Sequence, residues 1–189
     1  MGFKPVRPML IRNACDSKLF YPPKEKTSST GRKLRLISTS WSDNMRKGFD
    51  TYQYLDENLD FSKYEYDFVG RSPVAFKNIK MNSPLASKEL GERLRQADVF
   101  IFSSPQDPAS NSLLEAIYTG LPVIYAASGG NLEFTWYNGI GFKDAKEIPS
   151  ILKTLERDFE SYSLCRNHRT ISEVVEGYLK ALELPLTVS

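Results

Sequence analysis

The sequence predicts an α/β domain built on a doubly wound parallel sheet, and three observations support this prediction. Short apolar segments alternate along the chain with longer segments of helical periodicity, a pattern typical of parallel sheets covered by helices on both faces. Residues 99–102, VFIF, are apolar at every position, as in strands buried on both sides. The chain has 189 residues, 41% hydrophobic and 25% charged, which is ordinary for one globular domain with a sizeable core.

The first half of the chain contains three predicted strands and one predicted helix. Residues 34–40 are largely apolar and are bounded by serines, and residues 64–69 alternate before a glycine, so both are predicted as strands. Residues 79–81 are predicted as a short edge strand. The helix begins at about Asp43, with Asp43 or Asn44 as its N-cap, because large apolar residues recur after it at helical spacing.

The second half continues the alternation. Apolar residues recur at helical spacing in four predicted helices, at residues 86–96, 109–119, 147–159 and 171–182. Apolar runs predict strands at residues 99–102, 123–126 and, more briefly, 141–142. Gly120 ends the helix at 109–119, since glycine readily adopts the left-handed conformation that stops a helix.

Three parts are predicted along the chain. Residues 1–12 are interpreted as a leader or linker, residues 13–160 as the α/β domain, and residues 161–189 as a helical extension. Within the domain, residues 13–23 are interpreted as a turn with a strand end, and residues 24–33, KEKTSSTGRK, as a polar loop.

Composition argues against several classes of function. The net charge is +2 with scattered basic residues, so no nucleic-acid partner is expected. Cys15 and Cys165 lack metal-like spacing, which favours reduced thiols in a cytoplasmic protein. The single histidine, His168, lies in a polar run and is interpreted as an exposed turn residue, so a histidine triad or histidine metal site is not expected. No apolar run of about 18 residues occurs, so no transmembrane segment is expected.

Residues 107–130, DPASNSLLEAIYTGLPVIYAASGG, say most about function. Two acids, Asp107 and Glu115, stand eight positions apart around the start of a predicted helix. A helix start attracts phosphate through its free N–H groups and its dipole, and carboxylates accept hydrogen bonds from hydroxyls. The segment therefore suits a ligand that carries both sugar hydroxyls and phosphates.

Three polar segments are predicted to meet at one edge of the sheet. Residues 41–48, 70–71 and 103–112 each follow a predicted strand. In parallel sheets, ligands bind outside the carboxyl ends of the strands. The strand order alone therefore predicts a binding site there.

Residues 107–130 resemble the E-x7-E region of retaining GT-B glycosyltransferases, with Asp107 and Glu115 in the acidic positions and the same Gly-x-Pro-Val strand and Gly-Gly turn afterwards. Further segments that resemble the C-terminal domain of this family are residues 11–23, 34–50, 66–70 and 90–104. The resemblance extends over roughly residues 13–142, and its specificity lies in the order and spacing of the motifs. It implies a Rossmann-like, donor-binding GT-B C-terminal domain of glycosyltransferase group 1, similar to family 4.

The implied reaction is metal-independent transfer of a sugar from a nucleotide-diphospho-sugar to an acceptor. No cofactor is expected besides this donor substrate. Fixed cations must then stabilise the charge on the diphosphate leaving group. Lys47 matches the family's K-G lysine, and Arg46 beside it is a second candidate, since Ser42 stands where many relatives have an arginine. The alternative for Lys47 and Arg46 is a pair of solvated helix residues.

The resemblance also assigns donor contacts. It places Asp107, where relatives usually have glutamate, at the donor sugar's hydroxyls, and Glu115 at the ribose hydroxyls. Asp107 before Pro108 is equally the pattern of a helix N-cap with proline at the first helical position, and Glu115 has the alternative of a solvated helix residue.

Small polar residues stand where the family has a glycine-rich turn that binds phosphate through backbone N–H groups. These residues are Ser110, Asn111 and Ser112, for which ordinary helix caps are the alternative. Gly70 and Arg71 are predicted to edge the nucleotide, with a strand-ending glycine and a surface arginine as the alternative. Trp41 and Trp136 are packing residues or, for Trp41, part of the site.

Three functions remain open from the sequence. The first is the donor-binding half of a retaining transferase, an enzyme whose acceptor domain is missing from this chain and is supplied by an N-terminal domain or a partner chain. The second is a non-catalytic nucleotide-sugar-binding or remnant domain, and the third is half of a sugar-nucleotide epimerase. The expected location is cytoplasmic, with peripheral membrane attachment as a variant.

Overall fold

The computed structural model describes residues 9–25, 31–135, 138–162 and 169–183. The predictions made for Trp136, Cys165 and His168 lie outside these residues. Within them, no helix is long and apolar enough to cross a membrane.

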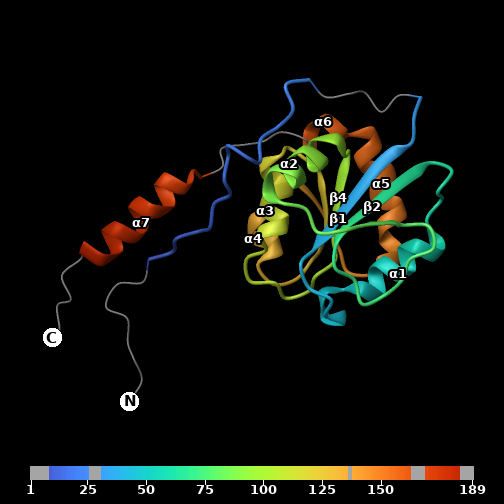
Figure 1. Ribbon diagram of the computed structural model, residues 1–189, viewed down its shortest axis with the longest axis horizontal. Helices are drawn as coiled ribbons and strands as arrows, with labels where there is room; N and C mark the ends of the chain where they lie inside the picture. Colours follow the sequence, from blue (N-terminus) through green and yellow to red (C-terminus); the bar gives the residue numbers. More distant parts are fainter. Residues whose placement is uncertain (1–8, 26–30, 136–137, 163–168, 184–189) are drawn as a thin grey trace, which may run out of the picture.

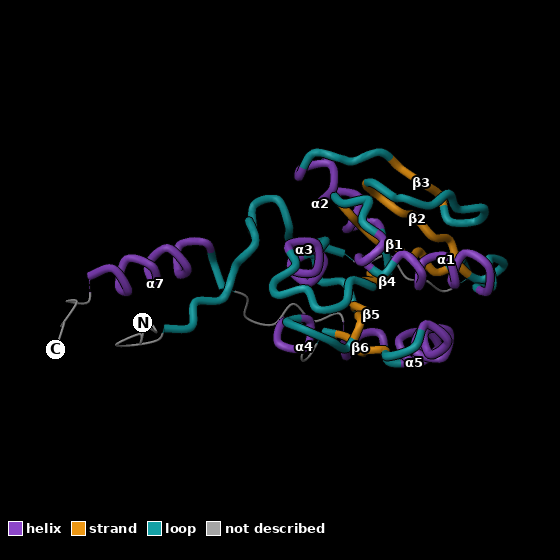
Figure 2. The backbone as a smooth tube through the Cα atoms, turned by 90° about the horizontal axis from the view of Figure 1, so that it is seen from below, coloured by secondary structure: helices purple, strands orange, loops and turns teal. Residues whose placement is uncertain are grey.

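One parallel sheet organises the described chain. Its strands are β1 (Leu34–Ser40), β2 (Tyr64–Gly70), β3 (Lys80–Asn82), β4 (Val99–Phe102), β5 (Val123–Ala126) and β6 (Gly139–Phe142). They pair in the order β3-β2-β1-β4-β5-β6, all in parallel, and Figure 2 shows this order from top to bottom. The predicted α/β doubly wound sheet is thus confirmed.

Helices cover both faces of the sheet. The larger helices of the domain are α1 (Phe49–Asn58), α2 (Ser87–Gln96), α3 (Asn111–Tyr118) and α5 (Ile148–Arg157). In Figure 2, α2 and α3 lie on one side of the strands, and α1 and α5 lie on the other. Shorter elements are the 3-10 turns η1 (Met45–Lys47) and η2 (Ala145–Glu147) and the helices α4 (Asn131–Phe134) and α6 (Phe159–Tyr162).

Two apolar cores lie between these layers. On the α1 and α5 side, Phe49, Tyr52 and Phe68 are buried, with ring centroids 5.1–5.6 Å apart. On the α2 and α3 side, residues such as Leu94 and Leu113 pack on the sheet and are fully buried. Apolar β4 serves both cores, which explains why each of its residues is buried.

The last helix, α7 (Ile171–Glu183), stands away from the two layers and runs beside the first described residues (Figure 1). A Cβ placed on Gly177 would meet the side chain of Ile11 at 3.5 Å. Large apolar side chains on both segments are exposed to solvent, namely Met9, Leu10, Ile171, Val175, Tyr178, Leu179 and Leu182.

Three local predictions are wrong. Residues 13–23 form a turn and coil without a strand end. The helix expected from about Asp43 is divided, because Gly48 adopts a left-handed conformation between η1, which Asn44 caps, and α1. The helix at 109–119 is shorter than predicted, since α3 begins at Asn111 after its N-cap Ser110.

The chain order reverses between β1 and β4. From β1 the chain proceeds outward to β2 and β3, and it then returns to β4 and proceeds the other way. A doubly wound sheet opens a crevice at the carboxyl ends of the two strands where this reversal occurs. The loops that follow β1 and β4 therefore face each other across a natural binding position.

Candidate donor-binding site

A hollow of about 330 Å³ lies at this reversal, within the size range of small-molecule sites. We call it the β1–β4 hollow. It is lined by Thr39, Ser40, Trp41, Ser42, Lys47, Tyr52, Phe102, Ser104, Asp107, Ala109, Ser110, Asn111 and Ser112. The segments predicted after the first and fourth strands therefore meet here.

The β1 side of the hollow is a series of hydrogen-bonded turns. The Ser40 hydroxyl donates to the Ser42 carbonyl at 2.8 Å, and the Ser42 hydroxyl accepts from the Asn44 N–H at 3.2 Å. The Asn44 side chain in turn accepts from the Arg46 N–H at 3.0 Å, which caps η1. These turns place Lys47 at the end of η1, directly before Gly48.

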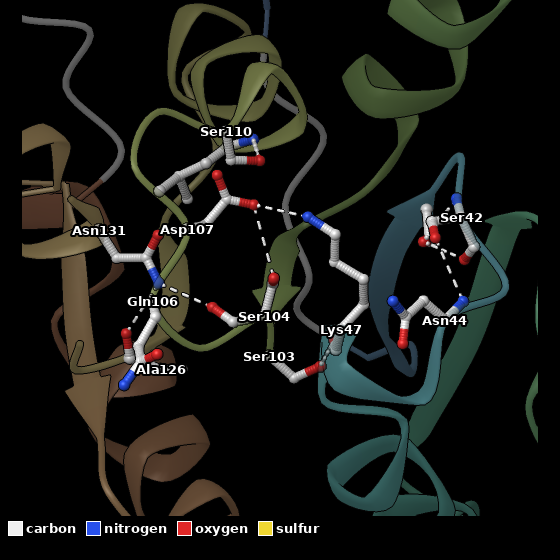
Figure 3. Close-up of polar contacts among 12 residues, drawn as sticks. Ser42, Asn44, Lys47, Ser103, Ser104, Gln106, Asp107, Ser110, Ala126 and Asn131 are labelled. Carbon is white, nitrogen blue, oxygen red and sulfur yellow. Dashed lines mark hydrogen bonds and ion pairs between the residues drawn. The ribbon is translucent and has the colours of Figure 1, made fainter. Parts of the chain in front are cut away.

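The β4 side brings an acid to this lysine. Lys47 Nζ donates to Asp107 Oδ2 at 3.0 Å, and the Ser104 hydroxyl lies 3.5 Å from the same oxygen. Figure 3 shows the Lys47 side chain reaching across from the β1 side to Asp107. The Asp107 side chain is 11% exposed and that of Lys47 43%, so the ion pair is partly shielded from water.

The loop that carries Asp107 is hydrogen-bonded to the Gly-Gly turn after β5. The Gly130 N–H donates to the Asp107 carbonyl at 2.9 Å, and the Gln106 N–H donates to the Ser128 hydroxyl at 2.7 Å. Buried Asn131 donates to the carbonyls of Ser104 and Ala126, both at 3.0 Å. Sequence reasoning missed Asn131, for which the only signal is its position after the two glycines.

Ser110, Asn111 and Ser112 form the wall at the start of α3. The Ser110 hydroxyl accepts from the Leu113 N–H at 3.4 Å and is the helix N-cap. The alternative in which Asp107 caps this helix is therefore wrong, because the loop continues for three more residues and Asp107 turns toward Lys47. Asn111 and Ser112, the first two residues of α3, line the hollow, and the free N–H groups of a helix start favour phosphate.

Glu115 lies one turn further along α3. It does not line the hollow itself, but it follows Asn111 and Ser112 at the spacing that places residues on one helix face. Its Oε2 atom is buried and accepts no hydrogen bond from the described residues. Burial raises its pKa to about 7, because desolvation disfavours the ionised carboxylate.

Thr39 is a second polar group buried without a partner. It lines the hollow at 5% exposure, and its hydroxyl has no hydrogen-bond partner among the described residues. Buried polar atoms without partners cost free energy. A polar ligand in the hollow would supply the partner.

Besides Glu115, three predicted site residues do not line the hollow. Arg46 is exposed on η1, and Arg71 is exposed after β2. Gly70 is buried, and a Cβ there would lie 1.9 Å from the Ser40 carbonyl oxygen, while the Arg71 N–H donates to that same oxygen at 2.8 Å. Gly70 and Arg71 therefore contact the end of β1 and do not line the hollow.

Metal-ligating groups are sparse in the described segments. Across residues 9–25, 31–135, 138–162 and 169–183, no group of three or more His, Cys, Asp or Glu side chains could hold a metal ion. Cys15 has a free thiol, and burial, with a further contribution from Glu115, raises its pKa to about 12.

A larger hollow, of about 600 Å³, lies at the opposite ends of β1 and β2. Among its lining residues Arg93 binds Asp67 at 2.7 Å, and Arg35 lies 3.5 Å from Asp98, which is not part of the lining. It lies at the amino ends of the strands, where this sheet type does not place its ligands. We therefore assign the site to the β1–β4 hollow.

Comparison with protein families supports the resemblance found in the sequence. Residues 76–165 match the family model described as "Glycosyl transferases group 1". This range contains β4, the Asp107 loop, α3 and the Gly-Gly turn. A comparison with curated proteins found no significant match.

Solved structures share the fold at low sequence identity. Sucrose-phosphate synthase from Thermosynechococcus elongatus superposes with a TM-score of 0.71 and 17% identity, over 92% of this chain and 51% of that one. Anabaena HepE, solved in complex with UDP and glucose, gives 0.73 and 15%, over 93% of this chain and 56% of that one.

A third structure shows which part of such proteins this chain resembles. The C-terminal domain of the glycosyl transferase group 1 family protein LpcC from Francisella tularensis gives a TM-score of 0.59 at 16% identity, over 91% of this chain and 100% of that one. The chain thus spans about half the length of the first two proteins and the whole of this isolated domain. The resemblance to the C-terminal domain of GT-B glycosyltransferases is confirmed.

Proposed function

Starting from a chain with the GT-B C-terminal fold and a match to glycosyl transferases group 1, we propose that it is the donor-binding half of a retaining glycosyltransferase. The transferase would move a sugar from a nucleotide-diphospho-sugar to an acceptor without a metal. The observation that carries the proposal is the convergence of Lys47, Asp107 and the start of α3 on one hollow at the strand reversal. HepE, which shares the fold, was solved with UDP and glucose.

The proposed diphosphate site is the wall formed by Lys47 and the start of α3. Ser110, Asn111 and Ser112 line it, and the N–H groups and dipole of α3 favour negative charge there. Lys47 is the cation that lines the same hollow, and it would stabilise the charge that develops as the diphosphate leaves. In this proposal Lys47 and the start of α3 take the place of a divalent ion at the leaving group.

The proposed hydroxyl sites are the two carboxylates. Asp107, at the hollow's other wall, would accept hydrogen bonds from the transferred sugar. Glu115, one helical turn deeper, would accept them from the ribose, which would also give its buried Oε2 atom partners. The retaining outcome of the reaction rests on the resemblance of residues 107–115 alone.

The acceptor half is proposed to be a second domain, supplied in the same protein or by a partner chain. The matched chains extend over about twice the length that this chain covers. Large apolar side chains are exposed on α7 and at Met9 and Leu10, and apolar side chains that gather on a surface mark interaction sites. We propose a cytoplasmic location for the assembled enzyme.

A non-catalytic nucleotide-sugar-binding or remnant domain is the second candidate. It is favoured by Ser42 in place of the family's arginine and by the outward position of Arg46, which leave Lys47 as the cation lining the hollow. The transferase half and a non-catalytic nucleotide-sugar-binding domain both predict donor binding, whereas a remnant domain would bind no nucleotide. The two domains that bind a donor differ in whether sugar is transferred once an acceptor half is present.

The test is a binding screen of the purified chain in EDTA. Thermal shift and calorimetry with UDP, GDP, ADP, CMP and their sugar conjugates should show one base that stabilises the protein increasingly with concentration. A Lys47→Ala, Glu115→Ala variant should lose this stabilisation. The matched control is Lys80→Ala, Glu65→Ala, which removes the same two residue types from exposed strand positions.

Two outcomes would refute the proposal. One is the absence of a shift with every nucleotide. The other is equal loss of binding in the site variant and in the control.

A further inference from the structure

We infer that Lys47 and Asp107 form an exchangeable ion pair: Lys47 binds Asp107 in the empty site and moves to the diphosphate when a nucleotide enters. Asp107 thereby competes with the ligand for Lys47 and sets how firmly the site retains its diphosphate product. The inference rests on the proposed function, because it requires that a diphosphate occupies the β1–β4 hollow.

The two partners differ in how firmly they are held. The backbone of the Asp107 loop is bound by the Gly130 N–H, by Ser128 and by buried Asn131, and the Asp107 side chain is 11% exposed. Lys47 lies on the other side of the hollow, with a side chain that is 43% exposed and makes its hydrogen bond only through Nζ. Movement of the pair would therefore be movement of the Lys47 ammonium, while the carboxylate stays in place.

The ligand position lies within the same hollow. Lys47, Asp107 and the first residues of α3 all line it. A diphosphate bound to the N–H groups of α3 would therefore share this small space with the lysine (Figure 3). It would offer Lys47 more negative charge than the single carboxylate does, and a short charge-assisted hydrogen bond favours the more highly charged acceptor.

The donor and the product differ in the charge of the terminal phosphate. A nucleotide sugar has its terminal phosphate esterified, whereas the product nucleoside diphosphate ends in a free phosphate that gains a further charge above about pH 6. The product would hold Lys47 more firmly than the donor would. Asp107 offers Lys47 an alternative partner, which lowers the free energy of the empty site and thereby favours product release. No covalent step or proton transfer is involved.

The exchange also leaves the Asp107 carboxylate free while a donor is bound. While Lys47 is bound to phosphate, the carboxylate can accept a hydroxyl of the donor sugar. After the product leaves, the carboxylate binds Lys47 again. Removal of the carboxylate should therefore raise the affinity for the nucleoside diphosphate and lower the affinity for the nucleotide sugar.

The experiment is a double-mutant cycle on the full chain, with UDP and GDP as probes, read by calorimetry at pH 7.5 and fixed ionic strength. Asp107→Asn should bind the nucleoside diphosphate about threefold to tenfold more tightly than the wild type. In the Lys47→Met background the same Asp107→Asn change should have no effect, since no lysine remains to exchange. Asp43→Asn, which removes an exposed charge from the same turn, is the matched control and should change affinity less than twofold in either background.

If Lys47→Met binds the nucleotide too weakly for calorimetry, a second measurement decides the inference. The ammonium resonance of Lys47, assigned by its loss in Lys47→Met, should shift in Asp107→Asn without ligand. On saturation with UDP or GDP the wild-type and Asp107→Asn resonances should converge. An unchanged resonance in Asp107→Asn would overturn the inference.

The outcomes separate the two proposals. If the wild type binds no nucleotide, the proposed function and the exchange both fail. If it binds but Asp107→Asn tightens binding equally with and without Lys47, the effect is general electrostatics and only the exchange is overturned. Weaker binding of the diphosphate by Asp107→Asn would overturn it as well.

Discussion

Gly48 and Ser103 approach so closely that a Cβ on Gly48 would lie 2.1 Å from the Ser103 carbonyl oxygen. Gly48 has φ +78°, and the Ser103 hydroxyl donates to its carbonyl at 2.9 Å and to that of Lys47 at 3.2 Å. The turn after β1 is thereby fixed to the end of β4. This contact sets the separation between the loops that carry Lys47 and Asp107.

Gly48→Ala should destabilise the protein by more than about 2 kcal/mol, because left-handed strain of about 1–2 kcal/mol adds to a backbone clash. Urea unfolding measures the loss. Gly31→Ala is the matched control, since Gly31 has φ +80° but nothing within 4 Å of an added Cβ, and it should show the strain alone. Equal losses in the two variants would show that the approach to Ser103 has no energetic consequence.

Glu115→Gln should make the empty protein more stable in mild alkali. The folded-state pKa of Glu115 is raised from 4.5 to about 7, so the folded state binds its proton more strongly than the unfolded state. The wild type therefore loses stability as pH rises from about 4.5 to about 7, and the full loss persists above that. It is on the order of 3 kcal/mol at most. Chemical denaturation at pH 4 and pH 8 should show the Gln variant similar to wild type at pH 4 and more stable at pH 8. Equal differences at both pH values would contradict the prediction.

The same substitution should weaken donor binding. In the proposed site an ionised Glu115 would accept hydrogen bonds from two hydroxyls, so affinity for a nucleotide sugar should rise as pH increases through about 7 and level off above it. Glu115→Gln should bind roughly tenfold less tightly at pH 8 and should lose the pH dependence. Nucleotide sugars suit this calorimetric test because they lack the free terminal phosphate that titrates near pH 6. A pH dependence that survives in the Gln variant would assign the titration to another group.

Asn131→Ala should affect stability and binding together. It removes the two hydrogen bonds to the carbonyls of Ser104 and Ala126. The Ala126 carbonyl keeps the Ser128 N–H as a donor at 2.7 Å, so the main cost is the buried Ser104 carbonyl, at about 1–2 kcal/mol. Because the Asp107 loop loses its support, nucleotide-sugar affinity should fall at a temperature where the variant is still folded. Asn58→Ala, at an exposed helix end, is the control and should change stability by no more than about 0.5 kcal/mol. Unfolding curves and calorimetry on both variants give the answer, and unchanged affinity in Asn131→Ala would show that the loop holds its position without Asn131.

Most of the fold could be predicted because its signals are local. Each of the strands β1 to β5 was expected close to its observed position, since apolar runs and alternation lie within a few residues of one another. The errors occur where a distant segment decides. Gly48 interrupts a helix because Ser103 lies against it, and Asp107 is not the N-cap of α3 because it pairs with a lysine 60 positions earlier.

Part of the candidate site could also be predicted from local signals. Lys47, Asp107 and the serines before α3 follow strands that the sequence identifies, and parallel strands bring such segments to one edge. Arg46 and Arg71 follow the same rule, yet their side chains point into solvent. A rule about strand ends places the backbone of a segment but not the direction of each side chain. Asn131 supports the site through backbone carbonyls, which leave no pattern in the sequence.

The sequence by itself determined the order of strands and helices, the α/β class, and which residue types stand at the strand ends. Periodicity and turn chemistry act over a few residues, so the amino-acid order contains them in full. Only the tertiary structure decided that Lys47 pairs with Asp107, that Glu115 is buried enough to raise its pKa to about 7, and that Gly48 must be glycine. Ion pairing, desolvation and close packing depend on distances through space between segments far apart in the chain, and folding alone sets those distances.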